Sequence, residues 1–170
     1  MSGFRFDSYC GQYCGACDIL VAYKEGIETG IPPEWDNLPT QLENLPFNAR
    51  AAEIKCLGCK TDTVFSGCAK CIIRKCAIDK KIAGTCLDCN SYRCWRFKVT
   101  GLIRKISGLE RKLPHLKFID QNMRTIQREG LATWTKEQEI EWKCPQCGKQ
   151  LTWYRDSCGR CKEAARTPAG

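Results

Sequence analysis

Residues 56–94 read CLGCKTDTVFSGCAKCIIRKCAIDKKIAGTCLDCNSYRC, and the eight cysteines of this stretch decide the fold. A Cys-x2-Cys pair places two thiolates on one metal ion from a single tight turn, and two such pairs complete a tetrahedral site. The simplest partition gives two four-cysteine sites, Cys56/Cys59/Cys68/Cys71 and Cys76/Cys86/Cys89/Cys94. A crossed arrangement satisfies the same chemistry, and both zinc and iron–sulfur clusters fit such sites.

A cysteine triplet precedes this stretch, with Cys10, Cys14 and Cys17 at the spacing C-x3-C-x2-C. Three thiolates leave one ligand position on a metal to be filled. The fourth ligand can come from elsewhere in the chain or from a cysteine of residues 56–94, or the position can stay open. His115 is the only histidine and is a candidate ligand, although a lone histidine more often has a packing role. Radical enzymes that use S-adenosylmethionine share the triplet spacing, but they need a partial barrel of about 200 residues, more than this chain offers.

A separate set of cysteines lies near the C-terminus. The segments KCPQCG (143–148) and SCGRC (157–161) each form a metal-binding turn, and the ligands are Cys144, Cys147, Cys158 and Cys161. Residues 151–154, LTWY, have the composition of a strand. The spacing therefore predicts a zinc ribbon, a β-hairpin over residues 148–157 with a closed structural zinc site.

Composition favours metal binding over disulfide bonds as the role of these thiols. The chain has 170 residues and 15 cysteines, and an odd number cannot pair completely. The first residues lack the basic start and apolar run of an export signal. The longest apolar run, residues 19–23, is far shorter than the roughly 20 residues of a membrane span. We therefore expect a cytoplasmic protein with reduced thiols, no membrane partner, and metal sites that contribute to folding.

The expected fold class is small α+β. A metal-stabilised cysteine-rich domain with short helices is predicted over residues 1–130, and a short helix with the zinc-ribbon β-hairpin over residues 131–170. One helix is predicted from Asp18 to a cap at Gly26. Residues 99–130 are also predicted to be helical.

An apolar stripe supports the prediction of helix in the second half of the chain. It follows the helical period, and its members are Leu116, Ile119, Met123 and Ile126. The stripe predicts core packing, with Gly130 as the C-terminal cap. A further short helix is predicted over residues 135–142, which open with a capping-box pattern. The proline-rich residues 26–50 are expected to be an irregular insert that Trp35 and Phe47 tether to the body.

The positive charge of the chain is concentrated in its middle. The net charge is +8, and residues 96–130 carry nine basic and three acidic side chains, a net +6. This segment is a candidate surface for an anionic protein or a nucleic acid. Its candidate contact residues are Arg104, Lys105, Arg111, Lys112, Lys117, Arg124 and Arg128. The alternative is an ordinary solvated helix face, because a four-cysteine zinc site carries a charge of about −2 and offsets part of the excess.

Enzyme signatures are missing from the sequence. It has no Walker phosphate loop, no G-x-G-x-x-G, no H-E-x-x-H and no G-x-S-x-G. With one histidine and no evident carboxylate pair, catalysis is not expected. Trp153 and Tyr154 are candidates for stacking on nucleic-acid bases, although packing of the predicted hairpin is the favoured interpretation.

Several motifs, in order, resemble the cysteine-rich domain-of-unknown-function family 3795. They are YCGAC (13–17), CLGC (56–59), CIIRKCA (71–77) and CLDCNSYRC (86–94). The segments NMRTIQREG (122–130) and WKCPQCG (142–148) are similar to longer members that end in a zinc ribbon. That family often has a proline before the last core cysteine, where this chain has Arg93, which affects the local turn and not the ligand. The resemblance implies metal binding by these cysteines and no established activity.

The sequence thus predicts a metal-binding, non-catalytic interaction module with about three zinc sites. The alternative is an iron–sulfur protein. In that case the N-terminal domain holds a 4Fe–4S cluster for electron transfer or redox sensing.

Overall fold

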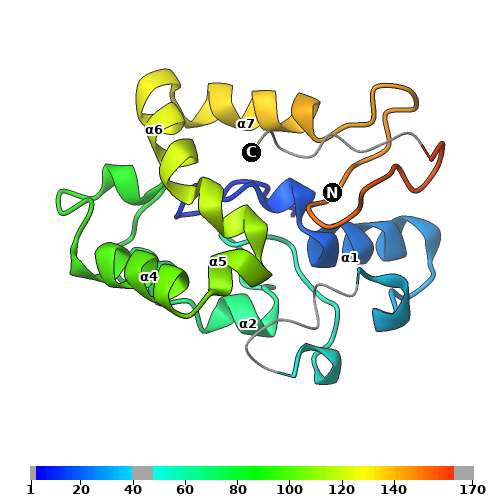
Figure 1. Cartoon of the computed structure of the whole chain (residues 1–170), viewed down its shortest axis with the longest axis horizontal. Helices are drawn as coiled ribbons and strands as arrows, with labels where there is room; N and C mark the ends of the chain where they lie inside the picture. Colours follow the sequence, from blue (N-terminus) through cyan, green and yellow to red (C-terminus); the bar gives the residue numbers. More distant parts are fainter. Residues whose placement is uncertain (1–2, 40–47, 163–170) are drawn as a thin grey trace.

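The computed structural model describes residues 3–39 and 48–162, and this part of the chain is helical (Figure 1). Its elements, with η marking 3-10 helices, are η1 (Cys14–Ala16), α1 (Asp18–Thr29), η2 (Trp35–Asn37), η4 (Ala49–Ala51), α2 (Ser66–Ala69), α3 (Ile72–Asp79), η5 (Cys86–Asp88), α4 (Trp95–Ile106), α5 (Leu109–Lys112), η6 (Pro114–Phe118), α6 (Ile119–Glu129) and α7 (Leu131–Glu141). The described residues contain no strand, and an isolated antiparallel bridge joins Lys143 and Gln150. The predicted α+β class is therefore wrong.

The predicted β-hairpin over residues 148–157 is absent because its backbone N–H groups donate to two separate segments of the chain. The N–H of Leu151 donates to the carbonyl oxygen of Trp142, at an N–O distance of 2.8 Å. Two residues later, the N–H of Trp153 donates instead to the carbonyl oxygen of Ala16, at 3.0 Å. A ladder needs successive bonds to one partner strand, so the segment forms turns around its cysteines instead.

Cysteines begin the helices of the N-terminal region. Cys17, Cys71 and Cys94 are the N-cap residues of α1, α3 and α4. Cys14 and Cys86 open the short helices η1 and η5. The first N–H groups of a helix have no partner within the helix and can donate to a side chain there. The sequence therefore places thiols at helix starts.

Helix α1 begins at Asp18 as predicted but ends beyond the predicted cap at Gly26. The cap is Gly30, whose φ of 72° lies in the left-handed region that glycine adopts most easily. Gly26 has another role. A Cβ atom there would lie 2.9 Å from the carbonyl oxygen of Ile31, so only glycine allows the chain after α1 to fold back this closely.

The stretch predicted as helical over residues 99–130 consists of several elements. Helix α4 begins earlier, at Trp95. Gly108, with φ of 67°, separates α4 from α5, and Pro114 opens η6. A residue with positive φ and a proline both interrupt helical hydrogen bonding, so the chain turns at these points instead of continuing one long helix.

The predicted apolar stripe lies in the core. Ile119, Met123 and Ile126 of α6 are buried, and Leu116 packs against them from η6. Gly130, with φ of 86°, ends α6, and α7 starts directly after it at Leu131 instead of at residue 135. The two helices therefore form a hairpin with a one-residue connection.

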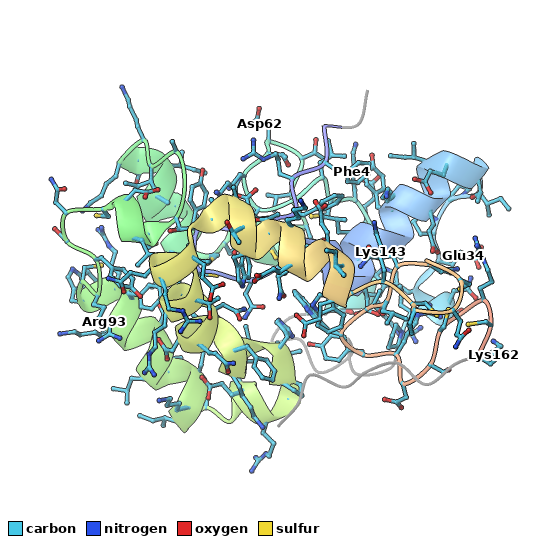
Figure 2. All side chains as sticks on the ribbon, turned by 90° about the horizontal axis from the view of Figure 1, so that it is seen from above. Phe4, Glu34, Asp62, Arg93, Lys143 and Lys162 are labelled. Atoms are coloured by element: carbon cyan, nitrogen blue, oxygen red, sulfur yellow. The ribbon has the colours of Figure 1, made fainter. Side chains whose placement is uncertain are left out.

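The N-terminal segment lies in the middle of the molecule, between α7 on one side and α2 and α4 on the other (Figure 1). Seen from above, α6 and α7 cover its centre (Figure 2). Tyr13 of this segment packs edge-to-face against Trp134 of α7, with 6.3 Å between ring centroids. Both rings are buried in one apolar cluster that includes residues before and after residue 130.

The division of the chain into a domain over residues 1–130 and a second over residues 131–170 stays a prediction.

The insert after α1 is anchored by Trp35. Its indole N–H donates to the carbonyl oxygen of Ala52 at 2.8 Å, and its ring packs against Phe65. The other predicted anchor, Phe47, lies outside the described residues. None of the helices in the described part of the chain is long and apolar enough to cross a membrane.

Candidate metal centre

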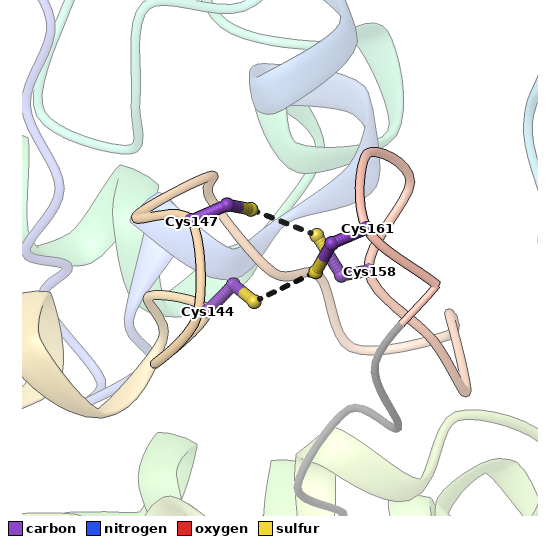
Figure 3. Close-up of side chains that lie close together, drawn as sticks. All are labelled: Cys144, Cys147, Cys158 and Cys161. Carbon is purple, nitrogen blue, oxygen red and sulfur yellow. Dashed lines mark hydrogen bonds between the residues drawn. The ribbon is translucent and has the colours of Figure 1, made fainter.

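Four cysteines near the end of the described chain converge on one point (Figure 3). Their Sγ atoms all lie within 4.8 Å of one another, and the residues are Cys144, Cys147, Cys158 and Cys161. The Sγ–Sγ distance is 3.4 Å between Cys144 and Cys161 and 3.5 Å between Cys147 and Cys158. The cysteines that the spacing groups together thus form one cluster that can hold a metal ion.

Short turns build this cluster. The N–H of Gly148 donates to the carbonyl oxygen of Cys144 at 2.9 Å, and Gly148 has the positive φ, 69°, that such a turn needs. In the second turn, the N–H of Arg160 points at the Sγ of Cys158, 3.4 Å away. Backbone N–H groups of Cys161 and Arg160 lower the pKa of Cys158 to about 6. This favours the thiolate, which is the form that binds metal.

The cluster has the dimensions of a site for one ion. A tetrahedral zinc with bonds of about 2.3 Å to sulfur holds its thiolates about 3.8 Å apart, close to the two distances observed. All four positions would be filled by protein thiolates. Such a closed site has no free position for water or substrate, which is typical of a structural metal and not of a catalytic one.

Polar contacts fix the cluster to the N-terminal half of the chain. The Nζ of Lys149 lies 3.2 Å from a carboxylate oxygen of Glu25 in α1. Arg155 donates from Nη2 to the carbonyl oxygen of Asn37 at 2.8 Å. Together with the backbone bond from Trp153 to Ala16, these contacts join the metal-binding turns to α1 and the insert that follows it.

The N-terminal triplet lies among the cysteines of the first two pairs. Burial raises the pKa of Cys14, and the nearby thiol of Cys59 raises it further. Burial also raises the pKa of Cys17 to about 12, with a contribution from Cys56. The thiols of this neighbourhood are Cys10, Cys14, Cys17, Cys56, Cys59, Cys68 and Cys71. This arrangement supports the option in which a cysteine of residues 56–94 completes the site of the triplet.

The remaining four cysteines line a second neighbourhood, and they are Cys76, Cys86, Cys89 and Cys94. Cationic side chains reach this group. Arg96 donates from Nη1 to the Sγ of Cys76 at 3.2 Å, and the Nζ of Lys80 lies 3.5 Å from the Sγ of Cys89. A backbone N–H of Ser91 and then Lys80 lower the pKa of Cys89. These four cysteines are the ones that the simplest partition of residues 56–94 assigns to the second four-cysteine site.

The N-terminal thiols are spaced more widely than the C-terminal ones. Within residues 3–39 and 48–162, only the C-terminal set brings three or more ligand atoms within 4.8 Å of one another. Sets of four cysteines bind zinc ions and iron–sulfur clusters alike.

His115 packs against aromatic side chains. Its ring stacks on Trp153, with 4.0 Å between centroids and 5° between planes. Its Nδ1 lies 2.6 Å from the hydroxyl oxygen of Tyr154. Removal of the ring from water lowers the pKa of His115 to about 3, and the charge of Arg104 adds to this effect. His115 is therefore neutral, and both Trp153 and Tyr154 pack against its ring.

The basic segment is mostly, but not entirely, on the surface. Arg104 is buried, with its Nε 3.4 Å from a carboxylate oxygen of Glu110, so its position differs from the expected exposed one. The other candidate contact residues are exposed, and they are Lys105, Arg111, Lys112, Lys117, Arg124 and Arg128.

An apolar surface on α4 is a feature that sequence reasoning missed. Trp95, Leu102 and Ile106 are 66%, 55% and 77% exposed, and Val99 and Ile103 lie on the same helix at 37% and 55%. We call these five residues the α4 face. The sequence held the signal, because positions 95, 99, 102 and 106 follow the helical period.

Comparison with known proteins agrees with the resemblance seen in the motifs. The family described as "Protein of unknown function (DUF3795)" matches residues 6–99, more than half of the chain. The match includes both N-terminal thiol neighbourhoods and ends before the C-terminal cluster, so it supports the family but not the form that ends in a zinc ribbon. No curated protein and no solved structure matches the chain. The chain belongs to the DUF3795 family.

Proposed function

We propose that this protein is a non-catalytic, zinc-stabilised binding module that docks an acidic protein through the α4 face. The observation that carries the proposal is the exposure of large apolar side chains on this one helix. Single exposed apolar residues are common, but a contiguous group of them marks an interaction site in a soluble protein.

Charges beside the α4 face favour an acidic partner. Arg96, Lys98 and Lys105 are exposed on the same helix, and α5 adds Arg111 and Lys112. A nucleic acid would use these cations but would leave the apolar side chains without a matching surface. A protein surface with apolar residues inside an acidic rim would match both features, which is why we favour a protein partner.

The metal sites supply the scaffold in this proposal. Zinc at the C-terminal cluster closes the end of the chain onto α1, and the N-terminal thiols hold the starts of α1, α3 and α4 in place. A small core gains stability from such sites, because the free energy of metal binding adds to that of folding. Docking itself requires no open metal position.

A matched pair of variants tests the docking surface. Leu102→Glu with Ile106→Glu places acid in the α4 face, and Ile140→Glu is the control because Ile140 is 67% exposed on α7, away from that face. Each protein is used to capture partners from a nuclease-treated lysate of its source. The captured protein is then purified and titrated against all three forms.

The expected result is a partner with an acidic surface that binds the unchanged protein and the Ile140→Glu control alike. Its affinity for the α4 double variant should fall by at least about tenfold, because two apolar contacts are lost and like charges are introduced. Equal binding by all three forms would contradict the proposal. Capture of a partner only from a lysate that has not been treated with nuclease would contradict the proposal and point to nucleic acid instead.

An iron–sulfur role is the second candidate function, and hydrogen bonds from cationic side chains to two of the N-terminal sulfurs favour it. Arg96 and Lys80 donate toward two of these sulfurs, and such hydrogen bonds tune the reduction potential of a cluster. Protein purified without oxygen would then be brown and contain iron and acid-labile sulfide. A colourless protein with zinc in place of iron would exclude this function.

A further inference from the structure

A cavity of about 590 Å³ lies between the turn at Gln12 and Tyr13, the helices η6, α6 and α7, and Trp153. None of its lining residues is a cysteine or belongs to the α4 face, so it is a separate feature. Its volume lies within the range of about 300–1,000 Å³ that is typical of small-molecule sites.

Six of the fifteen lining residues carry aromatic rings. They are Tyr13, His115, Phe118, Trp134, Trp142 and Trp153. Trp134 and Trp142 are 2% and 8% exposed, and Trp153 is held by its stack on His115. These three rings are therefore held in place before any ligand binds. The face of an aromatic ring carries negative potential and attracts cations.

The two amide side chains in the wall next to the N-terminal turn present oxygen atoms. Gln12 donates from Nε2 to the carbonyl oxygen of His115 at 2.7 Å, and Asn122 donates from Nδ2 to that of Gly11 at 2.8 Å. A carbonyl oxygen only accepts, so the amide nitrogens must face the protein. No described residue donates to either amide oxygen, which leaves both as acceptors.

The charge of the lining is negative. Helix α7 directs Glu137 and Glu141 to the cavity from the face that also carries Trp134. Lys117 is the one charged cation among the described lining residues, and its side chain is exposed at the rim, as are those of Glu137 and Glu141, so the lining carries a net charge of −1. Glu141 also accepts a hydrogen bond from Nε2 of Gln138 at 2.6 Å. His115 adds no charge, because its ring is neutral. Two carboxylates, two amide oxygens and aromatic faces together suit a ligand that donates hydrogen bonds and carries positive charge.

We propose that this cavity binds a small organic cation, a protonated amine, amidinium or guanidinium group carried on a flat apolar body. The aromatic walls contact the body, and the acceptors of Gln12, Asn122, Glu137 and Glu141 receive the N–H groups. A neutral molecule of the same shape loses the charge contacts. An anion is repelled by the carboxylates.

Three probes of nearly equal shape test the charge preference by isothermal titration of the full-length protein. Benzamidine is a flat cation, benzamide is its neutral counterpart and benzoate is its anionic one. We expect benzamidine to bind at least about tenfold more tightly than benzamide, and benzoate not to bind. Equal binding of benzamidine and benzamide, tighter binding of benzoate, or no binding of benzamidine would overturn the proposal.

Variants of α7 locate the bound cation. Glu137→Gln with Glu141→Gln should weaken benzamidine binding by roughly tenfold and leave benzamide unchanged. Glu139→Gln is the matched control, because Glu139 lies on the same helix but not in the cavity wall. Equal loss in the control would show that binding occurs elsewhere. If these tests fail, the proposal that the α4 face is a docking surface still stands, because the cavity and the α4 face share no residue.

Discussion

The backbone N–H of Trp153 donates a hydrogen bond to the carbonyl oxygen of Ala16, with 3.0 Å between nitrogen and oxygen. Ala16 precedes Cys17, and Trp153 lies between the two turns of the C-terminal cluster. The first and last groups of cysteines are therefore mechanically joined. Loss of a ligand at one metal site should therefore also destabilise the backbone around the other.

Loss of a C-terminal ligand should weaken the whole protein. Cys158→Ser is expected to remove one metal ion per chain and to lower the free energy of unfolding by about 4 kcal/mol or more. Metal analysis and denaturant unfolding measure both effects. Hydrogen exchange should also speed up at Ala16 and the start of α1. Ser157→Ala, a neighbouring exposed position, is the control; an intact metal content in Cys158→Ser would contradict the assignment.

A second prediction concerns the turn before Cys59. Gly58 has φ of 121°, and a Cβ atom there would lie 1.9 Å from the carbonyl oxygen of Arg5. Gly58→Ala should therefore lower the free energy of unfolding by about 3 kcal/mol or more, since both strain and a backbone clash result. Gly30 also has positive φ, in the left-handed helical region, but open space around it, so Gly30→Ala should cost only about 1–2 kcal/mol. Equal effects would show that the approach to Arg5 is not tight.

The third prediction is a pH dependence that His115 causes. Its pKa is about 3 in the folded protein and about 6.5 in the unfolded chain, so the unfolded state binds more protons between these values. The stabilising contribution is complete above about pH 6.5 and is lost as the pH falls towards 3, by up to about 1.4 kcal/mol per unit.

His115→Phe keeps an aromatic ring on Trp153 and should remove this slope. Denaturant unfolding between about pH 5 and 6.5 measures it. A variant as pH-sensitive as the unchanged protein would show that other groups cause the slope.

The fourth prediction concerns the ion pair of Lys60 and Asp7, whose side chains are 5% and 10% exposed. Burial alone would raise the pKa of Asp7, but its hydrogen bond and charge contact with Lys60 outweigh this and lower it. Asp7→Asn leaves the Lys60 charge without its partner and should cost about 3–5 kcal/mol. Adding Lys60→Met should recover most of this loss, because the charge is removed. No recovery in the double variant would mean that Asp7 acts through other contacts.

Features that depend on nearby residues were predictable from the sequence. The C-terminal cluster follows from two Cys-x2-Cys turns, and the buried face of α6 follows from the period of Ile119, Met123 and Ile126. Features that depend on distant contacts were not. Residues 151–154 have strand composition, but the bond from Trp153 to Ala16 replaces the hairpin ladder.

The arrangement of the N-terminal thiols shows the same limit. Spacing groups Cys56, Cys59, Cys68 and Cys71 as neighbours, but it gives no sign that the triplet lies among them. That proximity results from the path of the N-terminal segment through the middle of the fold (Figure 1). The apolar α4 face, in contrast, could have been found by counting the helical period from Trp95.

Metal content is the measurement that tests the central claim most directly. Zinc, iron and acid-labile sulfide per chain are determined on protein purified without oxygen, beside a variant with Cys144→Ser and Cys147→Ser. We predict bound metal in the unchanged protein and the loss of one zinc per chain in the variant. An unchanged protein that is folded and free of metal, with its thiols open to a thiol reagent, would contradict the claim that metal holds this fold together.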